Sequence, residues 1–555
     1  MYLITFLLVT LKAYNRFLNN IFCCFMAIPI IDIFAGPGGL GEGFSALIND
    51  ENQRAFKIAL SIEKDPLAHQ TLTLRSFFRQ FEVGDVPEEY YEFVRGKISI
   101  EDLYRAWPIE AEHAQREAWC GTLGDPDEHD QNAVSDDEVD DKIRTVLNGE
   151  QDWLLIGGPP CQAYSLVGRS RRQERILNEE TDKRVGLYKQ YLRILAKHSP
   201  SVFVMENVKG ILSAETSENQ VFSKILEDLS DPSACYPQNG ENEFNCPGYR
   251  IYSLVTEPEN FDENGNPTYR PKNFVIQAEK YGVPQTRHRV ILLGIRRDIE
   301  INPQIIYGRD EVSIGSVINS LPKLRSGLSK GVDSFNAWFS LIEGILEGDT
   351  LNDVDAEIIT DIREKILQIE DPHFGKGADY IEIENLQIGY LPEWYLDNRL
   401  NGVLNHASRS HMNSDIHRYL FVSCFGNIKQ QSPKLSDFPE GLLPAHLNVR
   451  QGIDDKKFAD RFRVQIANRA SKTVTSHISK DGHYYIHPDP TQCRSLTVRE
   501  AARIQTFPDN YFFCGPRTSQ FHQVGNAVPP YLAFQIAEVV NHVFEEMEIL
   551  AVHNN

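Results

Sequence analysis

The sequence has no CxxC pair among its nine cysteines and no regular cysteine spacing. It therefore gives no sign of a disulfide framework or a zinc site, and it suits a reducing cytoplasm. It also lacks an apolar run long enough to cross a membrane. The two N-terminal runs, residues 2–11 and 21–31, are too short, and no basic region precedes the first. We expect a cytoplasmic protein with no membrane association.

Positive charge is scarce overall, since the formal net charge is −22. Residues 125–141 account for much of the excess and contain no lysine or arginine, so we expect a solvated insertion loop there. Basic clusters at residues 169–172, 287–297 and 456–472 offset this elsewhere. Nucleic-acid binding depends on local phosphate-facing patches, so the total charge weakens the hypothesis of a nucleic-acid partner without excluding it.

With 555 residues, the chain is long enough for two or three compact units. Met26 begins MAIPIIDIFAGPGG, which is typical of the start of a first strand. Our hypothesis is that residues 1–25 are an extension from a misassigned start, either non-native or disordered.

Short apolar runs alternate with helical stretches after residue 28. IPIIDIFA, FKIALSIE, WLLIGGPP, SVFVMENV and VILLGI each indicate a buried strand. Helices are expected at residues 41–48 and 187–196. Strands that alternate with helices predict an α/β fold, a mainly parallel sheet with helices on both faces.

The alternation of strands and helices ends after residue 297, where irregular loops and acidic helices are expected instead. We predict a catalytic unit over residues 26–297 with an acidic insertion near 87–150, a smaller inserted domain over 298–465, and a C-terminal part over 466–555 that completes the first unit. Residues 531–547 form a strongly amphipathic pattern, expected to pack on the sheet beside the first strand. Thr497 and Glu500 have the spacing of a capping box at a helix start.

A glycine-rich turn follows the first strand. Gly36 and Gly38 allow a tight turn with close backbone approach to a ligand beside a helix N-terminus, although a purely structural turn is the alternative. Glu63 ends the next strand, where an acidic side chain accepts hydrogen bonds from ribose hydroxyls, and Asp85 is suited to accept one from an adenine amino group. Their order predicts a nucleoside site.

Cys161 lies just beyond a buried strand, in Gly-Gly-Pro-Pro-Cys-Gln, at the sheet edge where ligands bind in open α/β folds. A lone cysteine is most often buried and inert, but two prolines that stiffen its approach are hard to explain by packing. Such a thiol becomes a nucleophile where positive charge favours the thiolate. Glu206 ends the following strand, which predicts a nucleophile and an acid in one crevice.

At this point the sequence resembles the cytosine-C5 DNA methyltransferase family, of the bacterial restriction–modification type. The resemblance rests on six blocks in the family's order: IDIFAGPGGLGEGF, GGPPCQAYS, MENVKG, GVPQTRHRVILLGI, LTVREAARIQTFPD and QVGNAVPP. The blocks run from Ile31 to Pro530, so the resemblance spans nearly all of the chain outside residues 298–465. The resemblance implies a Rossmann-like S-adenosylmethionine-dependent methyltransferase sheet with a smaller inserted target-recognition domain.

The resemblance also implies a role for individual residues. Cys161 attacks C6 of the cytosine, Glu206 holds N3 and the exocyclic amine, and Arg289 contacts O2 with support from Arg287. The implied cofactor residues are Phe34, Gly36, Gly38, Gly39, Leu40, Glu63, Lys64, Asp85, Val86, Pro160, Leu187, Asn526 and Val528, and the implied substrate contacts are Gln162, Ser165 and Gln285. No metal is expected.

Two departures accompany the resemblance. Lys64 stands where members often stack an aromatic ring on the adenine, and the interval from Asp85 to Cys161 is longer than compact members need. The chemistry itself is physically consistent, because a thiolate added at C6 makes C5 enamine-like and splits one difficult step into two. The base must be flipped out of the duplex to be reached.

Residues 298–465 would read base edges and phosphates, but no target sequence follows from them. His406, His411 and His417 suggest a metal, but packing or phosphate contacts fit them better. We expect double-stranded DNA as partner, a monomer, and a cognate endonuclease that acts separately. The alternatives are an RNA-modifying relative, a nucleotide-binding oxidoreductase and a catalytically silent DNA-binding protein.

Overall fold

The computed structural model describes residues 27–124, 130–159, 179–212, 219–238, 241–242, 244–444 and 461–554. Its centre is a mixed sheet in the order β10-β15-β7-β6-β1-β2-β3, with β13 paired to β15. The strands of this sheet are β1 (Ile28–Ile33), β2 (Phe56–Glu63), β3 (Ala118–Cys120), β6 (Leu154–Gly157), β7 (Val202–Val208), β10 (Tyr249–Ser253), β13 (Val275–Gln277) and β15 (His288–Arg296).

The five strands from β7 to β3 are parallel, and β15 joins β7 in the antiparallel sense. Each strand predicted from an apolar run is present. Strands that are buried on both faces have continuous apolar sequences, so the runs were readable in isolation. The predicted α/β class is confirmed.

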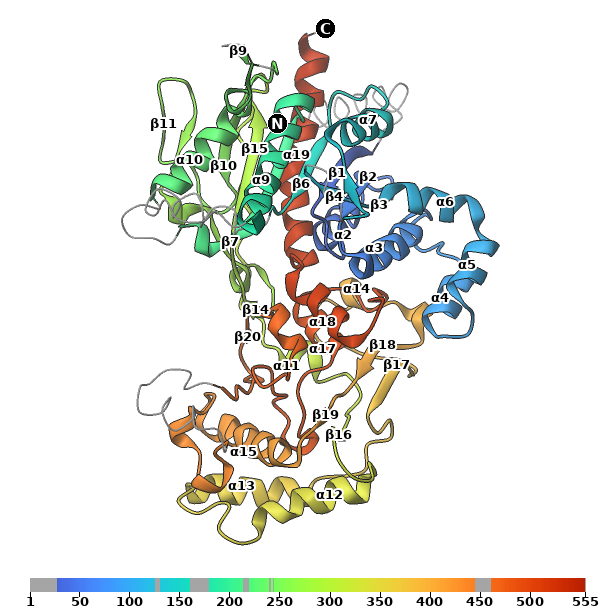
Figure 1. Cartoon of the computed structure of the whole chain (residues 1–555), viewed down its shortest axis with the longest axis vertical. Helices are drawn as coiled ribbons and strands as arrows, with labels where there is room; N and C mark the ends of the chain where they lie inside the picture. The colour runs from blue at the N-terminus through green and yellow to red at the C-terminus, as the bar shows by residue number, and fades with distance from the viewer. Residues whose placement is uncertain are drawn as a thin grey trace, which may run out of the picture.

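Helices cover both faces of this sheet (Figure 1). On one face, α2 (Gly39–Ser45) and the long C-terminal helix α19 (Pro530–Asn554) share a core with β1, β2 and β7. On the other face, α7 (Asp136–Leu147), α9 (Glu179–His198) and α10 (Asn219–Ser230) form a second core with the same sheet. The amphipathic pattern at residues 531–547 is therefore confirmed as a helix on the sheet, where Phe544 packs edge-on against Phe56 of β2.

The segment between β2 and β6 differs from the expected acidic loop. It holds α3 (Pro66–Arg79), α4 (Glu88–Val94), α5 (Ile100–Ala106), α6 (Pro108–Glu117), β3, β4 (Thr122–Leu123), β5 (Ala133–Val134) and α7. Ser135 caps α7, whose Val139, Asp140 and Ile143 are buried. The prediction of a solvated loop was wrong for residues 136–141, because the acidic run hides a helical spacing of buried positions.

A second body lies at the far end of the molecule from the sheet (Figure 1). Its core joins α12 (Phe335–Glu343), α13 (Ala356–Leu367) and α15 (Asn413–Lys429) to Phe462, Val464 and Ile486. Residues beyond 465 thus contribute to this core. The recognition role of residues 298–465 stays a prediction.

A third cluster connects the two bodies. It contains α11 (Gly315–Ile318), α14 (Pro392–Tyr395), α17 (Val498–Ile504) and α18 (Arg517–Asn526). The predicted capping box is confirmed: Thr497 Oγ1 accepts from Glu500 N–H, and the Glu500 carboxylate accepts from Thr497 N–H at 2.7 Å. Glu500 also forms a buried ion pair with Arg494 at 2.6 Å.

The remaining short strands form separate two-stranded sheets. They are β4 with β5, β8 (Pro237–Gln238) with β9 (Glu241–Asn242), β11 (Asn260–Phe261) with β12 (Pro267–Thr268), β14 (Gln285–Thr286) with β20 (Ser471–Lys472), β16 (Gly327–Leu328) with β19 (Ser410–His411), and β17 (Gly377–Glu382) with β18 (Gly402–Ala407). Among the helices that the structure describes, none combines the length and the apolar character needed to cross a membrane.

Candidate active site

The turn between β1 and α2 is built from left-handed backbone. Phe34 and Gly36 have φ near 59° and 58°, and Gly38 caps α2 with φ 92°. The last value favours glycine strongly. Gly39 serves packing instead, since a Cβ there would overlap the carbonyl oxygen of Val528 in the C-terminal block. The glycines thus shape the turn and allow the C-terminal block to lie directly against it.

Glu63 links this turn to the end of β2. Its Oε2 accepts a hydrogen bond from Gly36 N–H at 2.7 Å, and its Oε1 accepts one from Asp65 N–H at 2.8 Å. Burial raises the pKa of Glu63, against the opposing effect of these two bonds. Asp65 in turn caps α3 through Leu67 and Ala68. The carboxylate of Glu63 is therefore held rigidly beside the turn.

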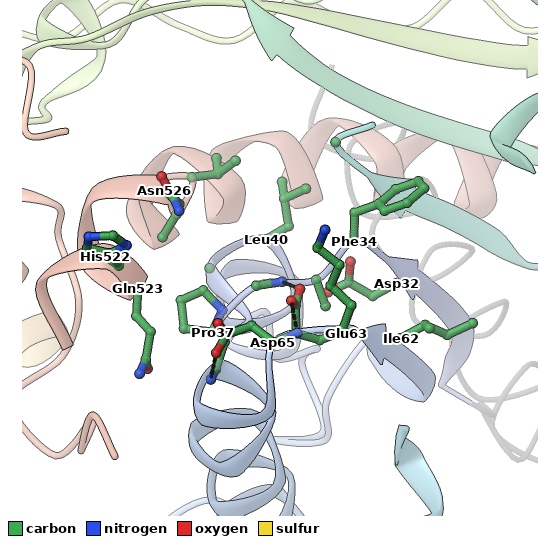
Figure 2. A pocket seen from close by; sticks show the side chains of 18 of the residues that line it. Asp32, Phe34, Pro37, Leu40, Ile62, Glu63, Asp65, His522, Gln523 and Asn526 are labelled. Carbon is green, nitrogen blue, oxygen red and sulfur yellow. Dashed lines mark hydrogen bonds between the residues drawn. The ribbon is translucent and has the colours of Figure 1, made fainter. Parts of the chain in front are cut away.

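A cavity of about 830 Å³ opens between the turn, the end of β2 and α18 (Figure 2). Its volume lies within the range of roughly 300–1,000 Å³ for small-molecule sites. The predicted cofactor residues that line it are Phe34, Gly36, Gly39, Leu40, Glu63, Lys64, Leu187, Asn526 and Val528. Gly38 does not line the cavity, and its left-handed backbone shapes the turn instead.

Asp85 and Val86 do not line this cavity, contrary to their predicted role. Val86 is 2% exposed and packs with Leu74 and Phe77 in a separate apolar cluster near α4. The strand that follows β2 in the sheet is β3, and the residues after it, Gly121 to Leu123, are the ones that line the cavity. The helices α4 to α6 separate the two segments, so order along the chain misled the prediction.

Glu206 of β7 also lines this cavity. Its Oε1 pairs with Arg289 Nε at 2.8 Å, across the antiparallel strands β7 and β15. Gly158 leaves room for this carboxylate, since a Cβ there would lie 3.1 Å from Glu206 Oε2. Asn207 Nδ2 donates to Pro159 O at 3.0 Å and so fixes the Gly-Pro segment that leads to Cys161. The predicted acid and arginine are thus neighbours beside the predicted cofactor residues.

Comparison with protein families gives a match to C-5 cytosine-specific DNA methylase over residues 127–233 and 256–542. These ranges span more than half of the chain. The chain belongs to the C-5 cytosine-specific DNA methylase family.

Individual relatives agree with this family. The chain is 33% identical to Type II methyltransferase M.Bpa9945I of Bacillus paralicheniformis, over 93% of this chain and 98% of that protein. It is 25% identical to Type II methyltransferase M.DdeI of Desulfomicrobium norvegicum, over 94% and 90% respectively. It is 27% identical to DNA (cytosine-5-)-methyltransferase M.ApeKI of Aeropyrum pernix, over 72% and 83%.

The two other predicted residues of the QTRHR block are interior. Arg287 is 2% exposed and donates to Val474 O at 2.9 Å and Gly525 O at 3.2 Å. Burial, with Arg289 nearby, lowers the pKa of Arg287 to about 9. Arg287 is therefore fixed in the packing between β15 and the C-terminal block, and its role in supporting the site stays a prediction.

Gln285 is fully buried, and its amide bonds to Ile504 O, Gln505 and Val474 N–H. The structure thus places this side chain in the packing of the C-terminal block, away from the cavity. Its predicted substrate contact is not supported.

Several lining residues were missed from the sequence. His522 on α18 lines the cavity one turn before Asn526, and its Nε2 lies 2.7 Å from Ser479 Oγ. Asp32 on β1 also lines it. A charged residue inside an otherwise apolar strand was the available signal for Asp32. His522 offered none beyond its helical spacing from Asn526.

Four predicted residues lie outside the described part of the chain: Pro160, Cys161, Gln162 and Ser165. The described residues contain no cluster of three or more histidine, cysteine, aspartate or glutamate side chains arranged to hold a metal ion. His406 hydrogen bonds to Thr497 and Pro322, and His417 to Leu341, while His411 packs edge-on against Tyr419. The packing interpretation of these three histidines is confirmed.

Proposed function

We propose that the protein transfers a methyl group from S-adenosyl-L-methionine to C5 of a flipped-out cytosine in a specific duplex DNA sequence. Membership of the C-5 cytosine-specific DNA methylase family supports the general reaction. The observation that carries the proposal is the position of Glu206, paired with Arg289, on the same cavity as the turn at Gly36 and the carboxylate of Glu63. A cofactor pocket and a pyrimidine-binding pair therefore share one space.

The residues around the cavity fit the cofactor. Glu63 presents a rigid carboxylate to ribose hydroxyls, and Phe34, Leu123 and Leu187 supply apolar surface for a purine ring. The space beside Gly36 is open, since a Cβ there would meet nothing within 4 Å. Bound S-adenosyl-L-methionine supplies an electrophilic methyl group. Asn526 and His522 line the wall formed by α18 and suit the polar amino-acid end.

Cys161 is the proposed nucleophile. Its thiolate adds to C6 of the cytosine, the C5–C6 double bond opens, and the electron pair is accommodated at C5 and through the ring to N3. Glu206 holds a proton at N3, which stabilises the charge that develops there. Once C5 carries the methyl group, loss of the C5 proton re-forms the double bond and expels the thiolate.

Arg289 has two consequences for this chemistry. Its guanidinium fixes the orientation of the Glu206 carboxylate through their ion pair. Its Nη1 donates to His288 O at 3.0 Å, and we propose that an N–H group not used in these contacts donates to a carbonyl oxygen such as O2 of the base. A base reaches this pair only when it is rotated out of the helix, at a cost of a few kcal/mol in stacking and pairing.

The biological role follows from the named relatives. Because relatives named Type II methyltransferases align with more than nine-tenths of the chain, we propose a role in restriction–modification or phage defence. In this proposal a monomer acts on host DNA in the cytoplasm, and residues 298–465 recognise the target. Any cognate endonuclease acts as a separate protein.

The test exposes purified protein to labelled S-adenosyl-L-methionine with mixed duplex DNA and, separately, with transfer RNA, and maps the product by bisulfite sequencing. We expect label only in duplex DNA, at C5 of cytosine in one sequence context. Methyl groups on adenine, on cytosine N4 or only on RNA would overturn the proposal. RNA labelling would favour the RNA-modifying alternative.

A second arm addresses the nucleophile. Duplexes with 5-fluorocytosine at the target trap the covalent adduct, because no C5 proton is available to leave. We expect a stable protein–DNA adduct with wild type and none with Cys161→Ser. The C161S variant should still bind the cofactor, which separates loss of chemistry from loss of fold.

A further inference from the structure

Asp32 is a carboxylate that lines the cavity, near the carboxyl end of the inner strand β1. It lies in β1 between Ile31 and Ile33, in register with Ser61 of β2 and Ile156 of β6. Its side chain is 1% exposed, yet the residue lines the cavity (Figure 2). Neither carboxylate oxygen has a hydrogen-bond partner among the described residues.

The other carboxylates that line the cavity are engaged. Glu63 accepts two backbone hydrogen bonds, Asp65 caps α3, and Glu206 pairs with Arg289. Within the described part of the chain, Asp32 is therefore the lining carboxylate left without a partner. A buried carboxyl group without a partner is costly when ionised, so it needs either a proton or a counter-charge.

The surrounding protein does not provide that counter-charge. Arg79 of α3 favours ionisation of Asp32 but does not offset burial, and it pairs with Glu117 of α6 at 2.7 Å and, more distantly, with Glu42 of α2 at 3.8 Å. Glu63 of β2 and Glu117 both oppose ionisation of Asp32. Burial, the largest effect, raises the pKa of Asp32 to about 8. The neutral acid is therefore the favoured form of Asp32 at neutral pH as long as no cation lies beside it.

We propose that Asp32 is the counter-charge for the cationic sulfur of the cofactor, and that it makes the site prefer S-adenosyl-L-methionine to the neutral thioether product. This inference rests on the proposed function. A sulfonium ion in a low-dielectric cavity attracts a nearby carboxylate far more strongly than it does in water. Binding of the sulfonium ionises Asp32 and releases a proton to solvent. Once the sulfur is neutral, the attraction is lost and product release is favoured.

The test compares cofactor and product binding by calorimetry in three proteins: wild type, Asp32→Asn and Ser61→Ala. The asparagine keeps the shape of the side chain and removes the charge. Ser61 lies beside Asp32 in β2, is equally buried and does not line the cavity, so S61A controls for disturbance of the sheet. We expect D32N to lower the preference for S-adenosyl-L-methionine over S-adenosyl-L-homocysteine about tenfold, and S61A to leave it unchanged.

A second measurement needs no variant and so does not depend on the folding of D32N. An adenosine pair that lacks the amino acid, 5′-dimethylsulfonio-5′-deoxyadenosine and 5′-methylthioadenosine, differs at sulfur charge and carries no titratable amine. Wild type should bind the sulfonium member increasingly well as the pH rises from about 6.5 to 9, with proton release at pH 7. The thioether member should show neither effect.

Equal response of both ligands to D32N, or a sulfonium affinity independent of pH, would overturn the role of Asp32 and leave the proposed function intact. Failure of wild type to bind either S-adenosyl-L-methionine or S-adenosyl-L-homocysteine would instead remove the cofactor site and with it the proposed function. The two failures are therefore distinguishable in one data set.

Discussion

Arg289 Nε lies 2.8 Å from Glu206 Oε1, across the antiparallel strands β15 and β7. Both side chains are about one-sixth exposed, so the pair is desolvated enough to be oriented and open enough to meet a ligand. The ion pair fixes the direction of a carboxylate whose oxygens would otherwise rotate freely. The proposed transfer of a proton to N3 of the cytosine needs this carboxylate to be held in one orientation.

Glu206→Gln should therefore lower kcat for DNA methylation by about 10²–10³-fold, because an amide cannot hold the proton at N3. The affinity for S-adenosyl-L-methionine should remain within about threefold, since the proposed cofactor contacts are made by other residues such as Glu63 and Asn526. Single-turnover kinetics and cofactor titration measure the two quantities separately. Equal losses in both would show that Glu206 shapes the whole cavity instead.

Arg287 and Arg289 form a matched pair of variants. Arg287 is buried and bonds to the carbonyls of Val474 and Gly525, so Arg287→Met should lower the free energy of unfolding by about 2 kcal/mol. Arg289→Met should change it by less than about 1 kcal/mol and should instead reduce turnover. Denaturant unfolding and kcat are the measurements. A stable R287M protein with low activity would contradict the supporting role of Arg287.

Glu63→Gln should weaken binding of S-adenosyl-L-methionine by about 10–100-fold, because hydrogen bonds to a charged acceptor are stronger than those to an amide. The pKa of Glu63 is raised by burial, and binding requires the ionised form. Wild-type affinity for S-adenosyl-L-homocysteine, whose neutral sulfur does not respond to the charge of Asp32, should therefore fall as the pH drops toward that raised pKa, at a higher pH than for an ordinary glutamate, while E63Q stays flat. Titrations from about pH 5 to 8 check both statements.

Much of the catalytic fold could be predicted from the sequence because its strands are buried on both faces. IPIIDIFA, FKIALSIE and SVFVMENV carry their own signal, and helices or glycine turns separate them. Phe34 and Glu63 come together as expected because the carboxyl ends of parallel strands meet at one edge, and Leu187 of α9 lines the same cavity. The ion pair between Glu206 and Arg289 adds a contact between two strands that the sequence predicted separately.

The predictions that failed concerned residues whose positions depend on long-range contacts, which no local sequence pattern reveals. Asp85 seemed correctly placed in order, but α4 to α6 intervene before β3 returns to the sheet beside β2. Gln285 looked like a substrate contact because of its motif, yet its amide satisfies buried backbone groups at Ile504 and Val474. The helix α7 was not predicted because most of its residues are polar or charged, and only Val139, Asp140, Ile143 and Leu147 are buried.

The last prediction concerns that hidden helix. Asp140 on α7 is 1% exposed and contacts three basic side chains of α9: Arg193 at 2.8 Å, Lys197 at 2.7 Å and His198 at 2.8 Å. Burial opposes ionisation, but the hydrogen bonds from His198, Arg193 and Lys197 outweigh it and hold the pKa of Asp140 below its usual range. Removing the carboxylate takes the closest ion-pair partner from the buried Arg193, which keeps only Asp136 at 3.3 Å, so Asp140→Asn should lower the free energy of unfolding by about 3 kcal/mol at pH 7.

The pH dependence has a definite sign. A carboxyl whose pKa is lowered on folding contributes its stability above the pKa of the unfolded chain, about 4, and loses it as the pH falls further. The difference between wild type and D140N should thus persist down to about pH 5 and shrink below about pH 4. Asp141→Asn is the control, since Asp141 pairs with Arg144 on the exposed face of α7 and should change stability by less than about 0.5 kcal/mol. Similar losses in both variants would mean that the contact between α7 and α9 does not depend on the buried charge.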